Sequence, residues 1–227
     1  MPTLLLIHGG LWEDIGADWF WGRPGVIAGF ERLGFTVVAP NRPRRPSGWT
    51  ADAEDVAAAA RELIAGAPGG ASGAARESMG GASGGEPVTV VGGSFGCSVA
   101  VRLALDSPGL AACMVLAWPA SLGDRFTAIR VRAGLARLGA QPRVLDALLG
   151  TETMPSASDA ELAAIGIPVG VIPAVPPGPV HPRSAVDALL RLLPAAVELP
   201  GCPEAPRPEF APHLESFLAA VAGFAGR

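Results

Sequence analysis

Short apolar runs alternate with helix-like segments along almost the whole chain, and this alternation limits the possible folds more than any other sequence feature. Such an order predicts a mostly parallel sheet covered by helices on both faces. Each run is nearly continuously apolar, as expected for strands that are buried on both sides. The predicted strands are Thr3 to Ile7, Phe35 to Ala39, Val88 to Val91, Ala112 to Ala117, Ile167 to Ile172 and Ala196 to Leu199.

The segments between these runs have the apolar spacing and the cap residues of helices. The predicted helices are Pro24 to Leu33, Thr50 to Ala65, Gly96 to Asp106, Arg183 to Leu193 and Pro212 to Phe224. The sequence therefore predicts a three-layer α/β/α sandwich with a mostly parallel sheet of about six strands.

The length of 227 residues and a hydrophobic content of 49% suit a single domain over residues 1–227. Residues 124–165 interrupt the alternation with two helical patterns, and we interpret them as an inserted helical lid. The alternative is an ordinary crossover helix with a long loop. Residues 66–86 are rich in Gly, Ala and Ser without apolar periodicity, which predicts a flexible loop.

The net charge of -4 and the scattered basic residues argue against a nucleic-acid partner, and the basic run at 42–45 is interpreted as a solvated loop. The apolar N-terminal run is too short to span a membrane and lacks signal-peptide flanks, so we predict a cytoplasmic protein with no membrane partner. Three widely spaced cysteines favour reduced core residues over a disulfide or metal site. We expect a small-molecule substrate, no cofactor and no metal, while the oligomeric state is left open.

The stretch VTVVGGSFGC at 88–97 places Ser94 between a β-branched run and a helical pattern. Strand, tight glycine turn and helix form the context of a nucleophile elbow, in which glycines leave room for a strained serine backbone. A second G-x-S-x-G match at 81–85 lies in the Gly-rich stretch and lacks these flanks, so Ser83 is a decoy. The alternative for Ser94 is a glycine-rich turn that binds nothing.

These motifs together resemble the α/β-hydrolase superfamily. The run LLLIHGG at 4–10 is similar to its strand and His-Gly oxyanion loop, and VVAPNRPRRP at 37–46 is similar to its next strand and loop. The run VVGGSFG at 90–96 is similar to its nucleophile elbow. The resemblance covers nearly the whole chain, with the first strand here corresponding to the superfamily's third. It implies Ser94 as nucleophile and an oxyanion hole formed by the N–H of Phe95 with that of Gly10 or Leu11. His8 is expected to brace its loop.

The sequence departs from the superfamily pattern at two places. The acid expected after the strand at 167–172 is missing from PAVPPGPVHP, and the histidine expected after the last strand is missing from LPGCPEAPRPEF. We predict His213 as the base, because it starts the last helix, with His181 as the alternative base. Asp124 is the preferred orienting acid, and Glu204 and Glu209 are weaker candidates. Either histidine could instead be structural.

Trp12 and Trp118 are predicted to line an apolar substrate pocket, with core packing as the alternative. The resulting hypothesis is a serine hydrolase that cleaves an ester or thioester, possibly a lactone, of a small apolar substrate. The alternative is a non-hydrolytic protein of the same fold, either a cyclase or lyase or a ligand-binding protein that has lost the triad.

Overall fold

The computed structural model describes residues 1–66, 87–150 and 153–226. Its centre is a six-stranded sheet in the order β2-β1-β3-β4-β5-β6, and every strand pair is parallel. The strands are β1 (Thr3–Ile7), β2 (Thr36–Val38), β3 (Val88–Gly93), β4 (Ala111–Ala117), β5 (Val169–Ile172) and β6 (Ala196–Glu198). The predicted α/β sandwich and parallel sheet are confirmed.

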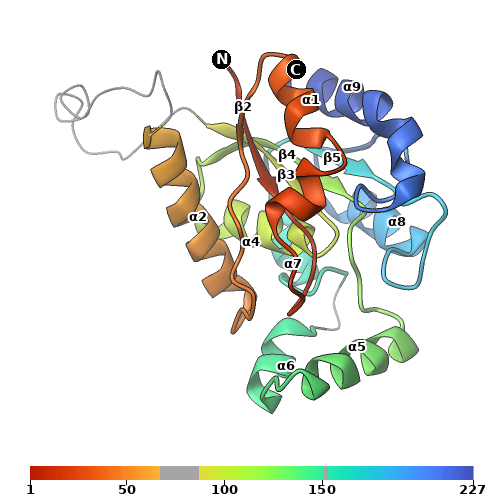
Figure 1. Cartoon of the computed structure of the whole chain (residues 1–227). Helices are drawn as coiled ribbons and strands as arrows, with labels where there is room; N and C mark the ends of the chain where they lie inside the picture. The colour runs from red at the N-terminus through yellow and green to blue at the C-terminus, as the bar shows by residue number, and fades with distance from the viewer. Residues whose placement is uncertain (67–86, 151–152, 227) are drawn as a thin grey trace.

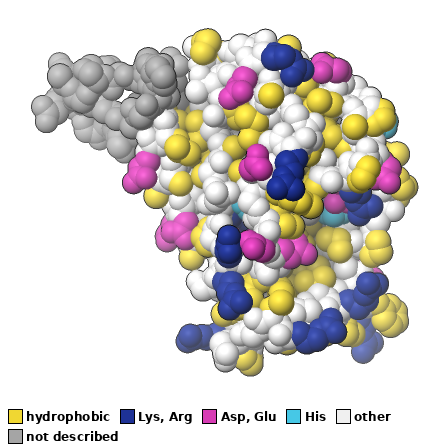
Figure 2. Space-filling model, in the orientation of Figure 1, with side chains coloured by type: hydrophobic (Ala, Val, Ile, Leu, Met, Phe, Trp, Pro, Cys, Tyr) yellow, Lys and Arg dark blue, Asp and Glu magenta, His cyan; other side chains and the backbone are white. Residues whose placement is uncertain are grey.

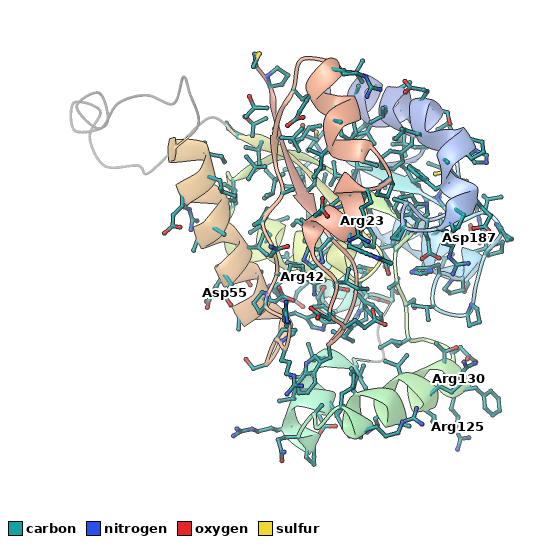
Figure 3. All side chains as sticks on the ribbon, in the orientation of Figure 1. Arg23, Arg42, Asp55, Arg125, Arg130 and Asp187 are labelled. Carbon is teal, nitrogen blue, oxygen red and sulfur yellow. The ribbon has the colours of Figure 1, made fainter. Side chains whose placement is uncertain are left out.

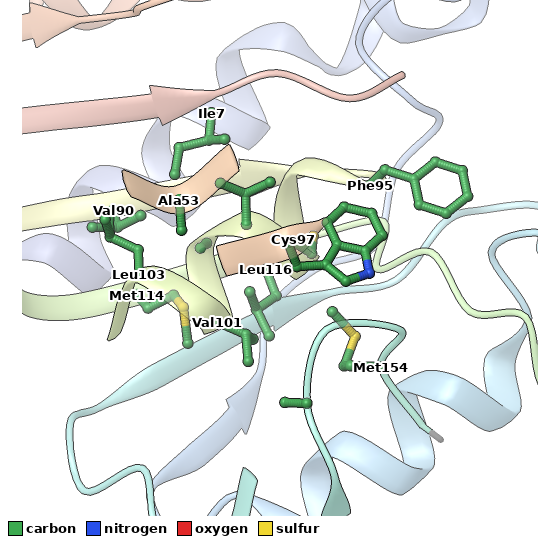
Figure 4. Packing of buried hydrophobic residues seen from close by; sticks show 14 of the residues in the cluster. Ile7, Ala53, Val90, Phe95, Cys97, Val101, Leu103, Met114, Leu116 and Met154 are labelled. Carbon is green, nitrogen blue, oxygen red and sulfur yellow. The ribbon is translucent and has the colours of Figure 1, made fainter. Parts of the chain in front are cut away.

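The helices lie in two layers around this sheet (Figure 1). They are α1 (Val26–Arg32), α2 (Trp49–Gly66), α4 (Gly96–Asp106), α5 (Arg125–Arg137), α6 (Pro142–Leu148), α7 (Asp159–Ala163), α8 (Arg183–Leu192) and α9 (Leu214–Ala225), with a π-helical turn η1 (Asp18–Gly22) and a 3-10 turn η2 (Pro208–His213). Alternate strand residues face opposite layers, because side chains point to opposite faces of a sheet at every step. Leu5 and Ile7 belong to the core cluster that includes buried residues of α2, α4 and α8, and Figure 4 shows Ile7 within it. Leu4 and Leu6 belong to the cluster on the other face, with buried residues of α1 and α9.

Most predicted elements agree with the structure to within a few residues at their ends. At the C-terminal helix the predicted start at Pro212 belongs to η2, and α9 begins two residues later at Leu214. The predicted flexible loop at 66–86 lies outside the described residues except for Gly66, which ends α2. Helices α5, α6 and α7 occupy the predicted insertion between β4 and β5, and α5 and α6 project below the sheet in Figure 1.

The carboxyl ends of β3, β5 and β6 bring three loops to the same edge of the sheet, where parallel α/β proteins place their ligands. The loops after β5 and β6 are tied together just beyond the strands. Ala174 and Cys202 form a parallel bridge, and the N–H of Val175 donates to the carbonyl of Cys202 at 3.1 Å. This connection fixes the spacing of the loop segments that follow.

Candidate active site

Ser94 lies in a sharp turn between β3 and α4, in a strained backbone conformation. Its φ is 53°, a left-handed value that is uncommon for residues other than glycine. A Cβ on Gly92 would lie 2.7 Å from the carbonyl oxygen of Gly96, and one on Gly96 would overlap the carbonyl of Ile7. The flanking glycines are therefore required by the close approach of backbone. This is the strand, turn and helix geometry that the sequence predicts.

A chain of two hydrogen bonds leads from Ser94 to a carboxylate. Ser94 Oγ is 2.9 Å from His181 Nε2, and His181 Nδ1 is 2.9 Å from Glu204 Oε1. The ionised carboxylate can only accept, so it selects the tautomer in which Nδ1 carries the proton and Nε2 is free to accept from the serine hydroxyl. The three side chains thus have the hydrogen-bonded order of a serine, a base and an orienting acid, which is the arrangement that can activate a serine.

Glu204 is held in its charged form. Burial of its side chain opposes ionisation, but the hydrogen bond and charge of His181, with the nearby charge of Arg207, outweigh it and lower the pKa of Glu204. Arg207 Nη2 is 3.2 Å from Glu204 Oε1. The side chains of His181 and Glu204 are 10% and 16% exposed, so the pair is shielded but still open to a substrate.

The structure does not bring the preferred base and acid of the sequence analysis to Ser94. The side chain of His213 is exposed at the end of η2, where the residue is the N-cap of α9. Asp124 is exposed and caps α5, where it accepts a hydrogen bond from the N–H of Thr127 at 2.7 Å. The side chain and the N–H of Thr127 together lower the pKa of Asp124. Glu209 lies in the first turn of η2 and is exposed. His181 and Glu204, the weaker candidates, make the contacts instead.

His181 and Glu204 were weaker candidates because each follows the strand where the superfamily pattern expects the other residue type. His181 follows β5, where the superfamily pattern expects an acid, and Glu204 follows β6, where that pattern expects the histidine. Each loop therefore lacks its expected residue type and carries the type expected in the other. Because the two loops are neighbours at one edge of the sheet, the exchange preserves the spatial arrangement. This reciprocal pattern is a signal that the sequence contained.

The loop after β1, which the sequence predicts to be the oxyanion loop, is held from behind by a buried arginine. Arg42 Nη1 donates to the carbonyls of His8 at 2.8 Å, Gly9 at 3.3 Å and Gly10 at 3.0 Å, while its Nη2 pairs with Asp52 at 2.7 Å. The side chains of Arg42 and Asp52 are 2% and 0% exposed. A guanidinium that is paired with one carboxylate and binds three carbonyls has most of its donors satisfied.

These contacts also orient the N–H groups on the other side of the loop. In a planar trans peptide, the carbonyl and the following N–H point in opposite directions. Because Arg42 binds the carbonyl of Gly10, the N–H of Leu11 points away from the arginine. Phe95, the N-cap of α4, offers a second donor at a helix N-terminus. The loop also packs closely on the nucleophile, since a Cβ on Gly9 would lie 2.9 Å from the Cβ of Ser94.

Glu13 lies near the N–H groups of Leu11 and Phe95, and the sequence analysis did not identify it as a site residue. Burial raises the pKa of its carboxyl group, and a hydrogen bond from the backbone of Leu11 partly offsets this rise. The Glu13 carboxyl group therefore lies close to one of the proposed oxyanion donors.

His8 has the bracing position that the sequence predicts. Its Nε2 accepts from the N–H of Arg42 at 2.9 Å, and its Nδ1 is 2.8 Å from the carbonyl of Gly9. Burial, together with the charge of Arg42, lowers the pKa of His8 from 6.5 to about 4. The imidazole is therefore neutral at pH 7, with the proton on Nδ1, and both ring nitrogens are occupied.

The structure places the two tryptophans in bracing roles. Trp118 is fully buried and stacks on Phe217 with ring centroids 5.4 Å apart, which contradicts the prediction that it faces a pocket. Its Nε1–H donates to the carbonyl of Cys202 at 2.9 Å, two residues before Glu204, so it supports the acid's loop from the core. Trp12 is half-buried, donates to the carbonyl of Pro46 at 3.1 Å and lies under the guanidinium of Arg45.

Two adjoining cavities lie under α5, and the first reaches Phe95, the residue after Ser94. The first, of about 450 Å³, is lined mainly by apolar side chains and includes Leu11 and Phe95, the proposed oxyanion residues; its lining is Leu11, Glu13, Phe95, Val131, Gly134, Leu135, Arg137, Leu138 and Val180. The second, of about 460 Å³, shares Val131, Arg137 and Val180 with the first and extends along α5. Trp12 and Trp118 line neither.

No helix in the described parts of the chain is long and apolar enough to cross a membrane. Within residues 1–66, 87–150 and 153–226, no three His, Cys, Asp or Glu side chains come together in a way that could hold a metal ion. Cys97, Cys113 and Cys202 are buried and unpaired.

Comparison with known proteins relates the chain to solved structures. No protein-family model and no curated protein sequence matches it. BpoC from Mycobacterium tuberculosis, provisionally described as a non-heme bromoperoxidase, superposes with a TM-score of 0.68 at 17% identity, over 99% of this chain and 91% of that one. The meta-cleavage product hydrolase CumD from Pseudomonas fluorescens gives 0.64 at 17%, over 99% and 90%. The esterase RhEst1 from a Rhodococcus species gives 0.60 at 18%, over 99% and 90%.

The chain has the α/β-hydrolase fold. The match extends over nearly the full length of both partners in each comparison, so it includes the sheet, the elbow and the helical insertion between β4 and β5. At these identities the likeness concerns the fold alone, and the chemistry has to be argued from the side chains.

Proposed function

We propose that this protein is a serine hydrolase that cleaves carboxylic esters or thioesters. One observation carries the proposal: the continuous hydrogen-bonded path from Ser94 through His181 to Glu204, with both contacts at 2.9 Å. Two sequence absences favoured a non-hydrolytic protein, but the neighbouring loops supply a histidine and a carboxylate in exchanged order. The triad is recognised by geometry and not by chain order.

In the proposed mechanism, Ser94 Oγ attacks the substrate carbonyl while His181 Nε2 removes the hydroxyl proton. The carbon–oxygen double bond opens, and the N–H groups of Phe95 and Leu11 stabilise the resulting oxyanion. As the tetrahedral intermediate collapses, His181 donates its proton to the departing alcohol or thiol, which leaves an acyl-serine. Water then attacks the acyl group with His181 again as base, and Ser94 regains its proton when the acid is released.

The cavity next to the oxyanion donors supports an apolar acyl group. Leu135, Leu138 and Val180 contribute most of its wall together with Leu11 and Phe95. Apolar walls with a few directed polar groups are typical of small-molecule sites. We therefore infer that the acyl part of the substrate is small and apolar and lies under α5.

The test is covalent labelling with a fluorophosphonate, read as a mass increase of the intact protein, combined with turnover of a p-nitrophenyl alkanoate. Wild type is expected to gain a single label, and Ser94→Ala none. His181→Ala should lower kcat/KM by at least about a thousandfold, with Glu204→Gln less severe. His213→Ala is the matched control, because it removes an exposed histidine that has no contact with Ser94, and it should keep wild-type activity.

Loss of labelling in His213→Ala with labelling kept in His181→Ala would overturn the assignment of the base. A wild type that takes no label and hydrolyses esters no faster than Ser94→Ala would overturn the hydrolase itself. That second result would favour a ligand-binding or proton-transfer protein of the same fold.

A further inference from the structure

Helix α5, which covers the two cavities, is strongly basic. It carries Arg125, Arg130, Arg132 and Arg137 and no carboxylate, although the chain as a whole has a net charge of -4. Arg132 Nη2 pairs with Asp146 of α6 at 2.6 Å, and this pair ties the two helices together. The other three arginines form no ion pair with a described carboxylate. Figure 2 shows basic side chains along the lower margin of the molecule, over α5 and α6, where Figure 3 labels Arg125 and Arg130.

Two of these unpaired arginines line the second cavity. Its walls are Thr127, Arg130, Val131, Ala133, Arg137, Pro179 and Val180, and no carboxylate is among them. Arg130 and Arg137 are seven residues apart, which is about two helical turns, so they lie on one face of α5 about 10 Å apart along its axis. Guanidinium groups at this spacing can bind one extended anionic group or two neighbouring ones.

The position of this cavity relative to the triad indicates which part of the substrate it takes. Val180, which lies where the two cavities meet and lines both, directly precedes His181, and the leaving group must lie beside the histidine that protonates it. The first cavity also contains Leu11 and Phe95, the donors for the carbonyl oxygen, which leaves the second cavity for the other end of the substrate. In the first cavity the carboxyl group of Glu13 offsets the charge of Arg137, whereas the second has Arg130 and Arg137 and no carboxylate. The two cavities therefore differ in charge as well as in position.

We propose that Arg130 and Arg137 select substrates whose leaving group is anionic, carrying a carboxylate or a phosphate. The acyl chain occupies the first, apolar cavity, and the charged alcohol or thiol extends through the second along α5. This inference rests on the proposed hydrolase function. The arginines are specificity residues, because they act on the charged end of the leaving group and not on the reacting atoms.

The test compares substrates that differ only in the charge of the leaving group. In the first arm, the butyrate ester of 4-hydroxybenzoic acid is compared with that of 4-hydroxybenzamide. In the second, butyryl-coenzyme A is compared with butyryl-N-acetylcysteamine, which has the same thiol end without the phosphates. Each ratio of kcat/KM, anionic over neutral, is measured for wild type and for Arg130→Gln/Arg137→Gln. The intrinsic reactivity of each probe cancels between proteins.

The control variant is Arg125→Gln/Arg143→Gln, which removes the same charge from α5 and α6 at exposed positions that line neither cavity. The double variant of the cavity arginines should lower the ratio roughly tenfold in at least one arm through a higher KM, while the neutral probe and the control keep wild-type values. The arm with the larger effect identifies the carboxylate or the phosphate as the source. Added salt should reduce the wild-type ratio.

An anionic-to-neutral ratio in both arms that is equal in wild type and the cavity variant would overturn the proposed selectivity while leaving the hydrolase intact. An equal loss in the Arg125 and Arg143 control would overturn the cavity assignment, because the effect would then come from general charge. Failure of wild type to turn over any of the four probes, with no fluorophosphonate labelling, would overturn the hydrolase and the selectivity with it.

Discussion

The carboxylate of Glu13 lies beside a backbone donor that an oxyanion would need. It lies close to the backbone of Leu11 and lines the cavity that also contains Phe95. A negative charge near a developing oxyanion raises the energy of the transition state. In the proposed mechanism, Glu13 therefore opposes the stabilisation that Leu11 and Phe95 provide.

Glu13→Gln is expected to raise kcat/KM for a neutral ester by several-fold, because the repulsive charge is lost while the size of the side chain is kept. Steady-state hydrolysis at pH 7.5 measures the effect. Asp14→Asn is the control, since it neutralises an adjacent but exposed carboxylate that pairs with Arg44. A fall in activity of Glu13→Gln alone would instead make Glu13 a participant in proton transfer.

The candidate site residues differ in how well the sequence alone could predict them. Ser94 was predictable because its strand and helix flanks are local and leave one conformation for the turn. The partners were harder, because His181 and Glu204 are 23 residues apart in sequence and meet only through the parallel neighbours β5 and β6. His213 was preferred because it starts the last helix, but η2 and α9 leave its side chain exposed there. The start of a helix was a poorer guide than the edge of the sheet.

At the scale of elements, the oxyanion loop depends on backbone shape as much as on Arg42. Gly10 has a φ of 85°, a left-handed value that L side chains rarely adopt. A Cβ at this position would lie 3.3 Å from Ile15 Cδ1 and 3.4 Å from Glu13 Oε2. Any side chain there strains the loop whose carbonyl Arg42 binds and whose next N–H forms the proposed donor.

Gly10→Ala is expected to lower kcat about tenfold or more with little change in KM, because the donor of Leu11 shifts relative to the oxyanion. It should also cost roughly 1–2 kcal/mol of stability, which comes from the backbone strain. Gly34→Ala is the matched control: its φ is 86°, no atom lies within 4 Å of the added Cβ, and it is the turn after α1. Kinetics and urea unfolding of both variants separate the two effects, and an equal loss of kcat in Gly34→Ala would contradict the role of the loop.

Elements were predicted well where burial was continuous and less well where turns decide the boundary. β1 matches its predicted range because the whole run Thr3–Ile7 enters the sheet, whereas the strand predicted from Phe35 shortens to Thr36–Val38 at the sheet edge. The insertion between β4 and β5 was recognisable as helical. The arginines that α5 turns toward the cavities could not be predicted. Which residues of α5 line the cavities depends on how α5 packs on the domain, and the pattern of its own sequence does not show this.

For the whole molecule, the alternation of apolar runs and helices was enough to predict the layers, because parallel strands with helical crossovers have few alternatives. The free energy of unfolding should depend on pH because polar side chains are buried in this fold. His8 is buried together with Arg42 and Asp52, which support the loop after β1. Its imidazole is neutral in the folded protein. The unfolded chain has no such restriction, so protons link folding to pH at this residue.

The sign of this linkage follows from the lowered pKa of His8, about 4 in the folded protein against 6.5 for the free side chain. Between these values the unfolded state binds more protons than the folded state, so stability is complete above pH 6.5 and is lost as the pH falls toward 4. The loss between pH 7 and pH 5.5 should be about 1 kcal/mol. Urea unfolding of wild type at both pH values measures this loss.

His8→Gln should be less stable than wild type at pH 7 but lose most of the pH dependence of stability between pH 7 and pH 5.5. His213→Gln is the control and should keep this dependence. An unchanged dependence in His8→Gln would show that other groups cause it.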